Sequence, residues 1–66
     1  MKLRLNGNDY DFKGDGFLGA LLGEIQANPD QVAVMVNDRI IPKMERGALC
    51  LKDGDTVEVM TFMGGG

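Results

Sequence analysis

One stretch of helical periodicity, with β-strand patterns on both sides of it, most constrains how this chain can fold. Four apolar residues recur at spacings of three and four, which places them on one face of a helix: Leu18, Leu21, Leu22 and Ile25. With 66 residues the chain is long enough for only one hydrophobic core. We therefore expect residues 1–66 to form a single domain in which one helix packs across one sheet.

The strands are predicted by alternation of apolar and polar residues. Residues 1–6 alternate, Asn6-Gly7 is a typical two-residue hairpin turn, and Tyr10 and Phe12 continue the alternation on a second strand. Residues 32–37 predict an interior strand with three valines on one face. Asp38-Arg39 is expected to turn the chain into a short edge strand at Ile40-Ile41, which Pro42 ends.

The remaining segments complete the expected order of elements. Asp15 is expected to cap the helix, and Asn28-Pro29-Asp30 to end it. Residues 44–48 predict irregular structure or a single helical turn, and Cys50 is expected to be a small buried hydrophobe. The last strand, 56–63, is expected at the centre of the sheet and parallel to the first. This order predicts an α+β fold of the β-grasp (ubiquitin-like) type, a mixed sheet of four to five strands crossed by one main helix.

Composition excludes several classes of function. The chain has no histidine, and its single cysteine has no internal partner, so we expect no disulfide and no histidine or cysteine metal site. A net charge of −3 without a basic stripe argues against nucleic-acid binding. No apolar run approaches membrane-spanning length. We therefore expect a protein that binds neither metal nor membrane. An unpaired cysteine and no signal peptide predict that it is cytoplasmic.

The sequence ends in three consecutive glycines, Gly64, Gly65 and Gly66, directly after a hydrophobic strand pattern. Glycine loses more backbone freedom on folding than any other residue, so this run does not stabilise a fold. Fully extended, three residues reach about 10 Å, enough to pass through a channel too narrow for a Cβ atom. We therefore expect a flexible tail at residues 64–66 whose carboxylate, on Gly66, is the working part of the protein.

The last strand also predicts a partner-binding surface. Val57, Val59 and Thr61 are expected to face the core, so Met60 and Phe62 are expected to face away from it. Exposed methionine and aromatic side chains suit docking to other proteins. The predicted partner-binding residues are Met35, Met60, Phe62 and Met63. An alternative, in which Met60 or Phe62 simply closes the core, stays open at this point.

Five short segments, taken in their order and spacing, carry a family resemblance: residues 3–7, 34–37, 40–43, 53–59 and 61–66. Together they resemble the ThiS group of sulfur-carrier proteins of thiamine biosynthesis, with the molybdopterin carrier MoaD as a cousin, and the resemblance covers essentially the whole chain. Met35 stands where these carriers often have a charged residue, and residues 44–47 lack an aromatic that is often found there.

The resemblance implies a carried co-substrate with no active site and no bound cofactor of its own. A ThiF-like adenylyltransferase would use ATP and Mg²⁺ to adenylate the carboxylate of Gly66. A sulfur donor, such as a cysteine desulfurase, would then supply the sulfur for a thiocarboxylate, and a ThiG-like thiazole synthase would receive it. Three alternatives stay open: a MoaD-like carrier for molybdopterin synthesis, a ubiquitin-like modifier joined to lysines through Gly66, and an interaction module whose tail is idle.

Overall fold

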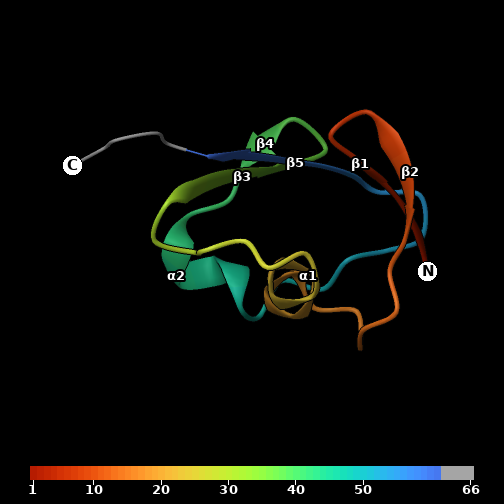
Figure 1. Cartoon of the computed structure of the whole chain (residues 1–66), viewed down its shortest axis with the longest axis horizontal. Coiled ribbons are helices and arrows are strands. Elements are labelled where there is room, and N and C mark those ends of the chain that lie inside the picture. The colour runs from red at the N-terminus through yellow and green to blue at the C-terminus, as the bar shows by residue number, and fades with distance from the viewer. Residues whose placement is uncertain (62–66) are drawn as a thin grey trace.

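The computed structural model describes residues 1–61 and places two helices along one face of a five-stranded mixed sheet (Figure 1). The strands are β1 (Lys2–Leu5), β2 (Asn8–Asp11), β3 (Val32–Val36), β4 (Arg39–Ile40) and β5 (Thr56–Thr61). The helices are α1 (Leu18–Glu24) and α2 (Lys43–Arg46). The predicted α+β architecture, with one main helix across a mixed sheet, is confirmed.

Strand β5 lies in the middle of the sheet, whose order is β2-β1-β5-β3-β4. It runs parallel to β1, with Leu5 opposite Val57, and antiparallel to β3, with Val34 opposite Val59. The predicted central position of the last strand and its parallel pairing with the first are both confirmed. A parallel pair needs a long crossover between its strands, and here the crossover carries both helices.

The two hairpin turns use left-handed backbone conformations. Asn6 and Gly7 have φ angles of 50° and 84°, as a two-residue hairpin turn requires, so the predicted turn is confirmed. The second turn is centred on Asn37 and Asp38, with φ angles of 51° and 67°. The turn predicted at Asp38-Arg39 was placed one residue too far along the chain, because Arg39 already belongs to β4 and pairs with Val36 of β3.

The ends of helix α1 differ from those predicted. Asp15 is not the cap: the residue before the helix is Phe17, and no side chain caps the first turn. The Oδ1 atom of Asp15 instead accepts the Phe17 N–H at 3.4 Å, in the loop before the helix. The helix ends at Glu24, ahead of residues 28–30, because Gln26 adopts a φ of 60° and turns the chain.

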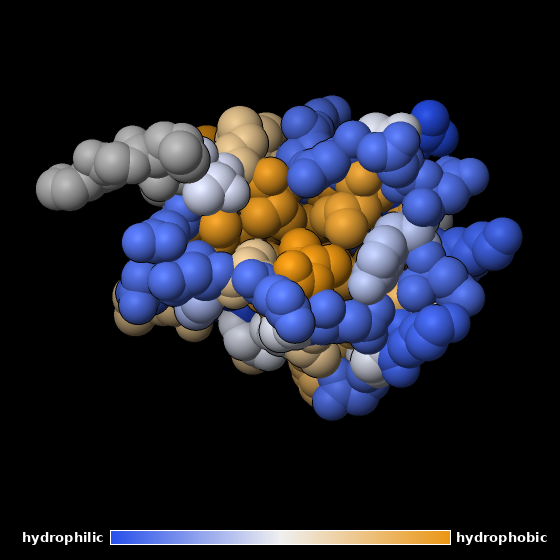
Figure 2. Space-filling view, viewed as in Figure 1, coloured by the Kyte–Doolittle hydropathy of each residue, from blue (hydrophilic) through white to orange (hydrophobic). Residues whose placement is uncertain are grey.

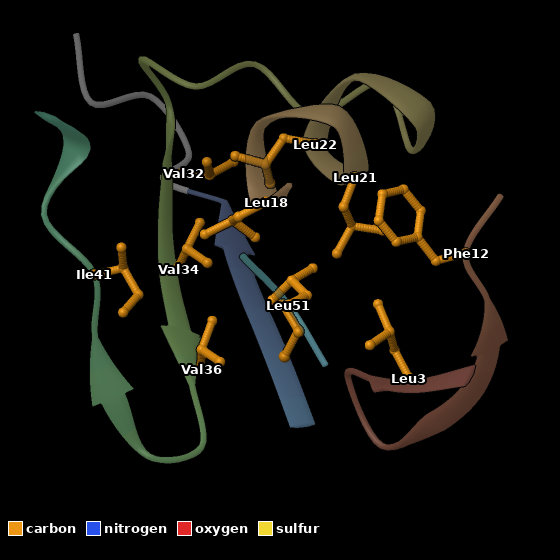
Figure 3. Close-up of a cluster of buried hydrophobic side chains, with 11 residues drawn as sticks. Leu3, Phe12, Leu18, Leu21, Leu22, Val32, Val34, Val36, Ile41 and Leu51 are labelled. Atoms are coloured by element: carbon orange, nitrogen blue, oxygen red, sulfur yellow. The ribbon is translucent and has the colours of Figure 1, made fainter. Parts of the chain in front are cut away.

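The hydrophobic core lies between the sheet and α1 (Figure 3). Leucines of α1 point toward valines of β3, and side chains from both ends of the chain close the cluster. The core residues are Leu3, Phe12, Leu18, Leu21, Leu22, Val32, Val34, Val36, Ile41, Leu51 and Val57. Every strand except β2 and β4 contributes to it, and Phe12 and Ile41 follow those two strands directly.

A few polar contacts fasten the helices to the rest of the domain. The Arg46 guanidinium donates to the carbonyls of Pro29, at 3.0 Å, and Ile41, at 3.3 Å, and so holds the single helical turn of α2. The Tyr10 hydroxyl donates to the Glu24 carboxylate at 2.5 Å and joins β2 to the end of α1. This hydrogen bond raises the pKa of Tyr10.

Apolar residues reach the surface between the two layers. Figure 2 shows them gathered in the middle of one face, with polar residues around them. Several hydrophobic side chains pack against the core while remaining partly exposed, among them Leu5, Ile25, Leu49 and Val59. A domain of this size buries only about 60% of its unfolded surface, so incomplete cover of the core is expected.

The two glycines of α1 predict opposite responses to alanine. A Cβ atom added at Gly23 would meet nothing within 4 Å, whereas one added at Gly19 would lie 3.1 Å from the Cα of Gly47. We expect Gly23→Ala to stabilise the fold by about 0.5–1 kcal/mol through helix propensity. Gly19→Ala should gain less or destabilise, because the backbone at Gly47 must move. Urea unfolding of both variants tests this, and equal stabilisation would contradict the close approach of the two glycines.

Candidate docking face and tail exit

The strand register places four apolar residues on the face of the sheet that the helices leave open. Met35 lies opposite Ile40, and Ala33 lies opposite Met60. All four alternate with strand neighbours that face the helices. We call Ala33, Met35, Ile40 and Met60 the outer patch. Ile40 is 70% exposed and Met60 49% exposed, while Ala33 and Met35 are half-buried.

The rest of this face is polar, which makes the outer patch distinct. On β1 and β2, Lys2 lies opposite Asp11 and Arg4 lies opposite Asp9. Lys13 donates a hydrogen bond to the Asp11 carboxylate and lowers its pKa. A sheet covered on one face usually carries polar residues on the other. The charged half follows this rule and the outer patch departs from it, so the patch is the candidate docking surface.

Two of the predicted partner-binding residues, Met35 and Met60, lie on this face as expected. Met60 does not close the core, since it is about half exposed on the face opposite the helices. The other predicted site residues lie outside the described residues: Phe62, Met63, Gly64, Gly65 and Gly66. Their roles in docking and in chemistry therefore stay predictions.

Sequence reasoning missed two members of the outer patch, Ala33 and Ile40. Adjacent residues of a strand point to opposite faces, so the pair Ile40-Ile41 already implied that one of them points outward. Ile41 is buried, and Ile40 is the exposed member. The signal was present in the sequence, but the pairing of Ile40 with Met35 was needed to show that both belong to one surface.

Thr61 was expected to face the core with Val57 and Val59, and this was only partly right. Thr61 lies opposite Val32 and so shares its face of the sheet, but it is exposed. It is the last residue of β5, where nothing among residues 1–61 covers it. Residues 62–66 follow Thr61 in sequence, after the end of the central strand.

Cys50 is exposed, so the prediction of a buried small hydrophobe was wrong. Its neighbours Leu49 and Leu51 turn toward the core, and Cys50 points the other way. The thiol lines a hollow of about 340 Å³ together with Arg39 and Lys52. Residues 1–61 hold no cluster of three side chains suited to a metal ion, and none of their helices is long and apolar enough to cross a membrane.

The exposure of Cys50 predicts that it reacts in the folded protein. Dithionitrobenzoate should modify the native chain as readily as a chain unfolded in guanidinium chloride, because no opening step is needed. Cys50→Ala should change the free energy of unfolding by no more than about 0.5 kcal/mol, as for other surface substitutions. A thiol that reacts only after unfolding would contradict this placement.

Comparison with known proteins identifies the family. The model of the ThiS family matches residues 3–66, nearly the whole chain. This chain belongs to the ThiS family. Its structure is similar to the crystal structure of the thiamine biosynthesis protein ThiS from Geobacter metallireducens, with a TM-score of 0.82, 33% sequence identity and complete coverage of both chains. The solution structure of the thiamine biosynthesis protein from the same organism gives a TM-score of 0.79 and is covered over 88% of its length. The predicted β-grasp fold is thereby confirmed.

Curated relatives are of two kinds. A thiazole synthase of Paramagnetospirillum magneticum is 39% identical over all 66 residues, and one of Magnetococcus marinus is 35% identical. The chain spans only 20% of the length of each of these two proteins. An uncharacterized protein of Pyropia yezoensis, ycf40, is 32% identical, and the chain covers 93% of it.

Proposed function

We propose that this chain is a sulfur carrier of thiamine biosynthesis that holds sulfur as a thiocarboxylate on Gly66. The observation that carries the proposal is the match to the ThiS family over residues 3–66, on a body that superposes along its full length on a thiamine biosynthesis protein. The chemistry requires partners, because a carrier of this kind brings the reacting group and they bring the catalytic groups.

The tail carboxylate must be activated before it can accept sulfur. With an ordinary pKa of about 3.5 it is ionised at neutral pH, and a carboxylate anion is a poor electrophile. A ThiF-like adenylyltransferase would transfer AMP from ATP, with Mg²⁺, to give an acyl-adenylate and pyrophosphate. A sulfur donor such as a cysteine desulfurase would supply a persulfide whose terminal sulfur displaces AMP, and a thiol reductant would then cleave the resulting acyl disulfide. The product is a thiocarboxylate, in which one oxygen of the carboxylate has been exchanged for sulfur.

A thiazole synthase is the proposed acceptor of this sulfur. The two thiazole synthases similar to this chain contain, within one polypeptide, a region that matches all 66 residues. A carrier domain in the same protein as the synthase supports a direct handover between the two. We therefore propose a ThiG-like thiazole synthase as the partner that unloads Gly66.

The outer patch is proposed to dock these partners. Ordering one residue of backbone costs about 1–2 kcal/mol, so threading three glycines into a partner's active site costs about 3–6 kcal/mol. Glycine has no side chain to offset that cost, and affinity must come from the folded body. The outer patch offers apolar surface beside the strand that leads to the tail. Phe62 and Met63, which follow this strand in sequence, are proposed to extend it.

Changes at the tail should abolish sulfur loading without unfolding the body. Deleting Gly66 removes the residue whose carboxylate reacts. Gly65→Trp adds a bulky side chain that blocks passage of the tail through a narrow channel in the partner. We expect no thiocarboxylate in either variant after incubation with the adenylyltransferase, ATP, Mg²⁺, a sulfur donor and a thiol reductant. Intact-mass spectrometry measures the product, and unchanged urea unfolding is the control.

The same assay separates the alternatives. Exchange of one oxygen for sulfur would support the sulfur-carrier function. A ladder of conjugates would indicate a ubiquitin-like modifier, and an unchanged mass would contradict the proposal. A loaded carrier that serves molybdopterin synthase and not thiazole synthase would reassign it to the MoaD-like class. Sulfur loading of the chain without Gly66 would show that the tail is not the site.

An acidic residue in the outer patch should weaken docking. Ile40→Asp places a charge where apolar surface would be buried, and we expect it to raise the Kd for the adenylyltransferase at least about tenfold. Met44→Asp is the matched control, because Met44 is also a large hydrophobic residue, 95% exposed, but lies on α2 in the helix layer. Calorimetric titration measures both. Equal weakening by the two variants would show that binding does not use the outer patch.

A further inference from the structure

The side chain of Asn6 continues the hydrogen-bond ladder between β1 and β5 beyond the end of β1. Two main-chain bonds, each 2.9 Å long, run from the Arg4 N–H to the Asp55 carbonyl and from the Asn6 N–H to the Val57 carbonyl. In a parallel ladder the next bond would run from the Val59 N–H to the main-chain carbonyl of Asn6. Here the side-chain Oδ1 of Asn6 accepts the Val59 N–H instead, at 2.8 Å.

The hairpin turn explains why a side chain is needed at this point. Asn6 has a φ of 50°, and the turn carries its main-chain carbonyl out of the ladder, toward the side-chain amide of Asn8 at 3.5 Å. Asparagine tolerates this left-handed conformation and also supplies a carbonyl oxygen on its side chain. Glycine would allow the turn but would leave the Val59 N–H without this partner.

This bond is the last one that holds β5 on its β1 side within residues 1–61. Strand β1 ends at Leu5, whereas β5 continues to Thr61. Met60 and Thr61 pair with β3 alone. Val59 is thus the point at which β5 changes from a strand held on both sides to one held on a single side. Met60 of the outer patch and the segment leading to the tail come directly after it.

We infer that Asn6 is a positioning residue for sulfur transfer, which fixes the direction of the end of β5, Met60 and Thr61, ahead of residues 62–66. The inference rests on the proposed function, since it assigns Asn6 a part in presenting Gly66. Without the bond to Val59, the end of β5 hinges on its pairing with β3. The fraction of molecules that present Met60 and the tail in the docking orientation then falls, and apparent affinity falls by the same factor.

Asn37 provides a matched control at the other end of the same strand. It has a φ of 51°, and its Oδ1 atom accepts the Thr56 N–H at 3.0 Å. Its Nδ2 atom also donates to the Asp55 carboxylate at 3.0 Å. Asn37 therefore makes the same kind of bond to β5 and a second bond to Asp55. It holds the beginning of β5, whereas Asn6 holds the part near its end.

The test compares Asn6→Gly with Asn37→Gly, and adds Asn6→Asp as a rescue. Glycine accepts a positive φ, so Asn6→Gly loses the bond to Val59 and Asn37→Gly loses two side-chain bonds, both without backbone strain. Aspartate keeps an oxygen acceptor at the same position and also tolerates the turn. Amide hydrogen exchange by NMR reports the bond itself. The KM and kcat for the carrier in loading by the adenylyltransferase, measured by intact mass well below the melting temperature, report its effect on transfer.

We expect Asn6→Gly to speed exchange of the Val59 amide by about 2–10-fold, as for loss of one ordinary hydrogen bond. The KM for the carrier should rise by the factor by which the fraction of molecules in the docking orientation falls, while kcat at saturation stays unchanged. Asn37→Gly should speed exchange at Thr56 and leave KM unchanged, although it loses two bonds. Asn6→Asp should restore both the exchange rate and the KM.

Three results would overturn the inference. Unaltered exchange at Val59 in Asn6→Gly would show that the bond does not hold the strand. An equal rise of KM in Asn6→Gly and Asn37→Gly would show that a general loss of stability, and not the position of the bond, causes the effect. An unchanged KM in Asn6→Gly, with normal loading of the unmodified chain, would overturn this inference alone. Failure to load the unmodified chain would instead overturn the proposed function, and the part of Asn6 in it.

Discussion

The insertion of β5 between β1 and β3 is the constraint on which the rest of the structure depends. Without this strand, the hairpin of β1 and β2 and the hairpin of β3 and β4 would be two separate pieces of sheet. The pairs that join them are distant in sequence, such as Arg4 with Thr56. Such contacts form only after a long loop has been closed, so the domain completes its sheet when its last strand enters the middle.

This arrangement joins the core and the proposed docking surface in one strand. On the side that faces the helices, Val57 of β5 is completely buried in the core and Val59 packs against it. Met60 lies on the other face, in the outer patch, and the glycine tail follows the strand in sequence. A partner that recognises the outer patch thus recognises a surface that exists only when the sheet is complete. The proposed docking surface therefore depends on the same strand pairing as the fold of the body.

Short polar side chains replace main-chain partners where the hairpins and loops turn away from the sheet. Asn6 and Asn37 do so at opposite ends of β5. Asp53 accepts the Lys2 N–H at 2.6 Å, and Asp55 accepts the Lys52 N–H at 2.9 Å in the turn before β5. Asp55 thus holds the turn before β5, and Asp53 ties that turn to the start of β1. The cost of leaving main-chain N–H groups unpaired explains why such residues stand at these positions.

The sequence by itself determined the types of the elements and the faces of their residues. Alternation of period two separated Val34 from Met35, and helical spacing placed the leucines of α1 on one face, because these patterns follow from backbone geometry alone. Tertiary structure decided what depends on which elements meet. It exposed Cys50, moved the second turn to Asn37, and joined Ile40 to Met35 and Met60 in one surface. Exposure and neighbours across strands are set by long-range pairing, which no local pattern encodes.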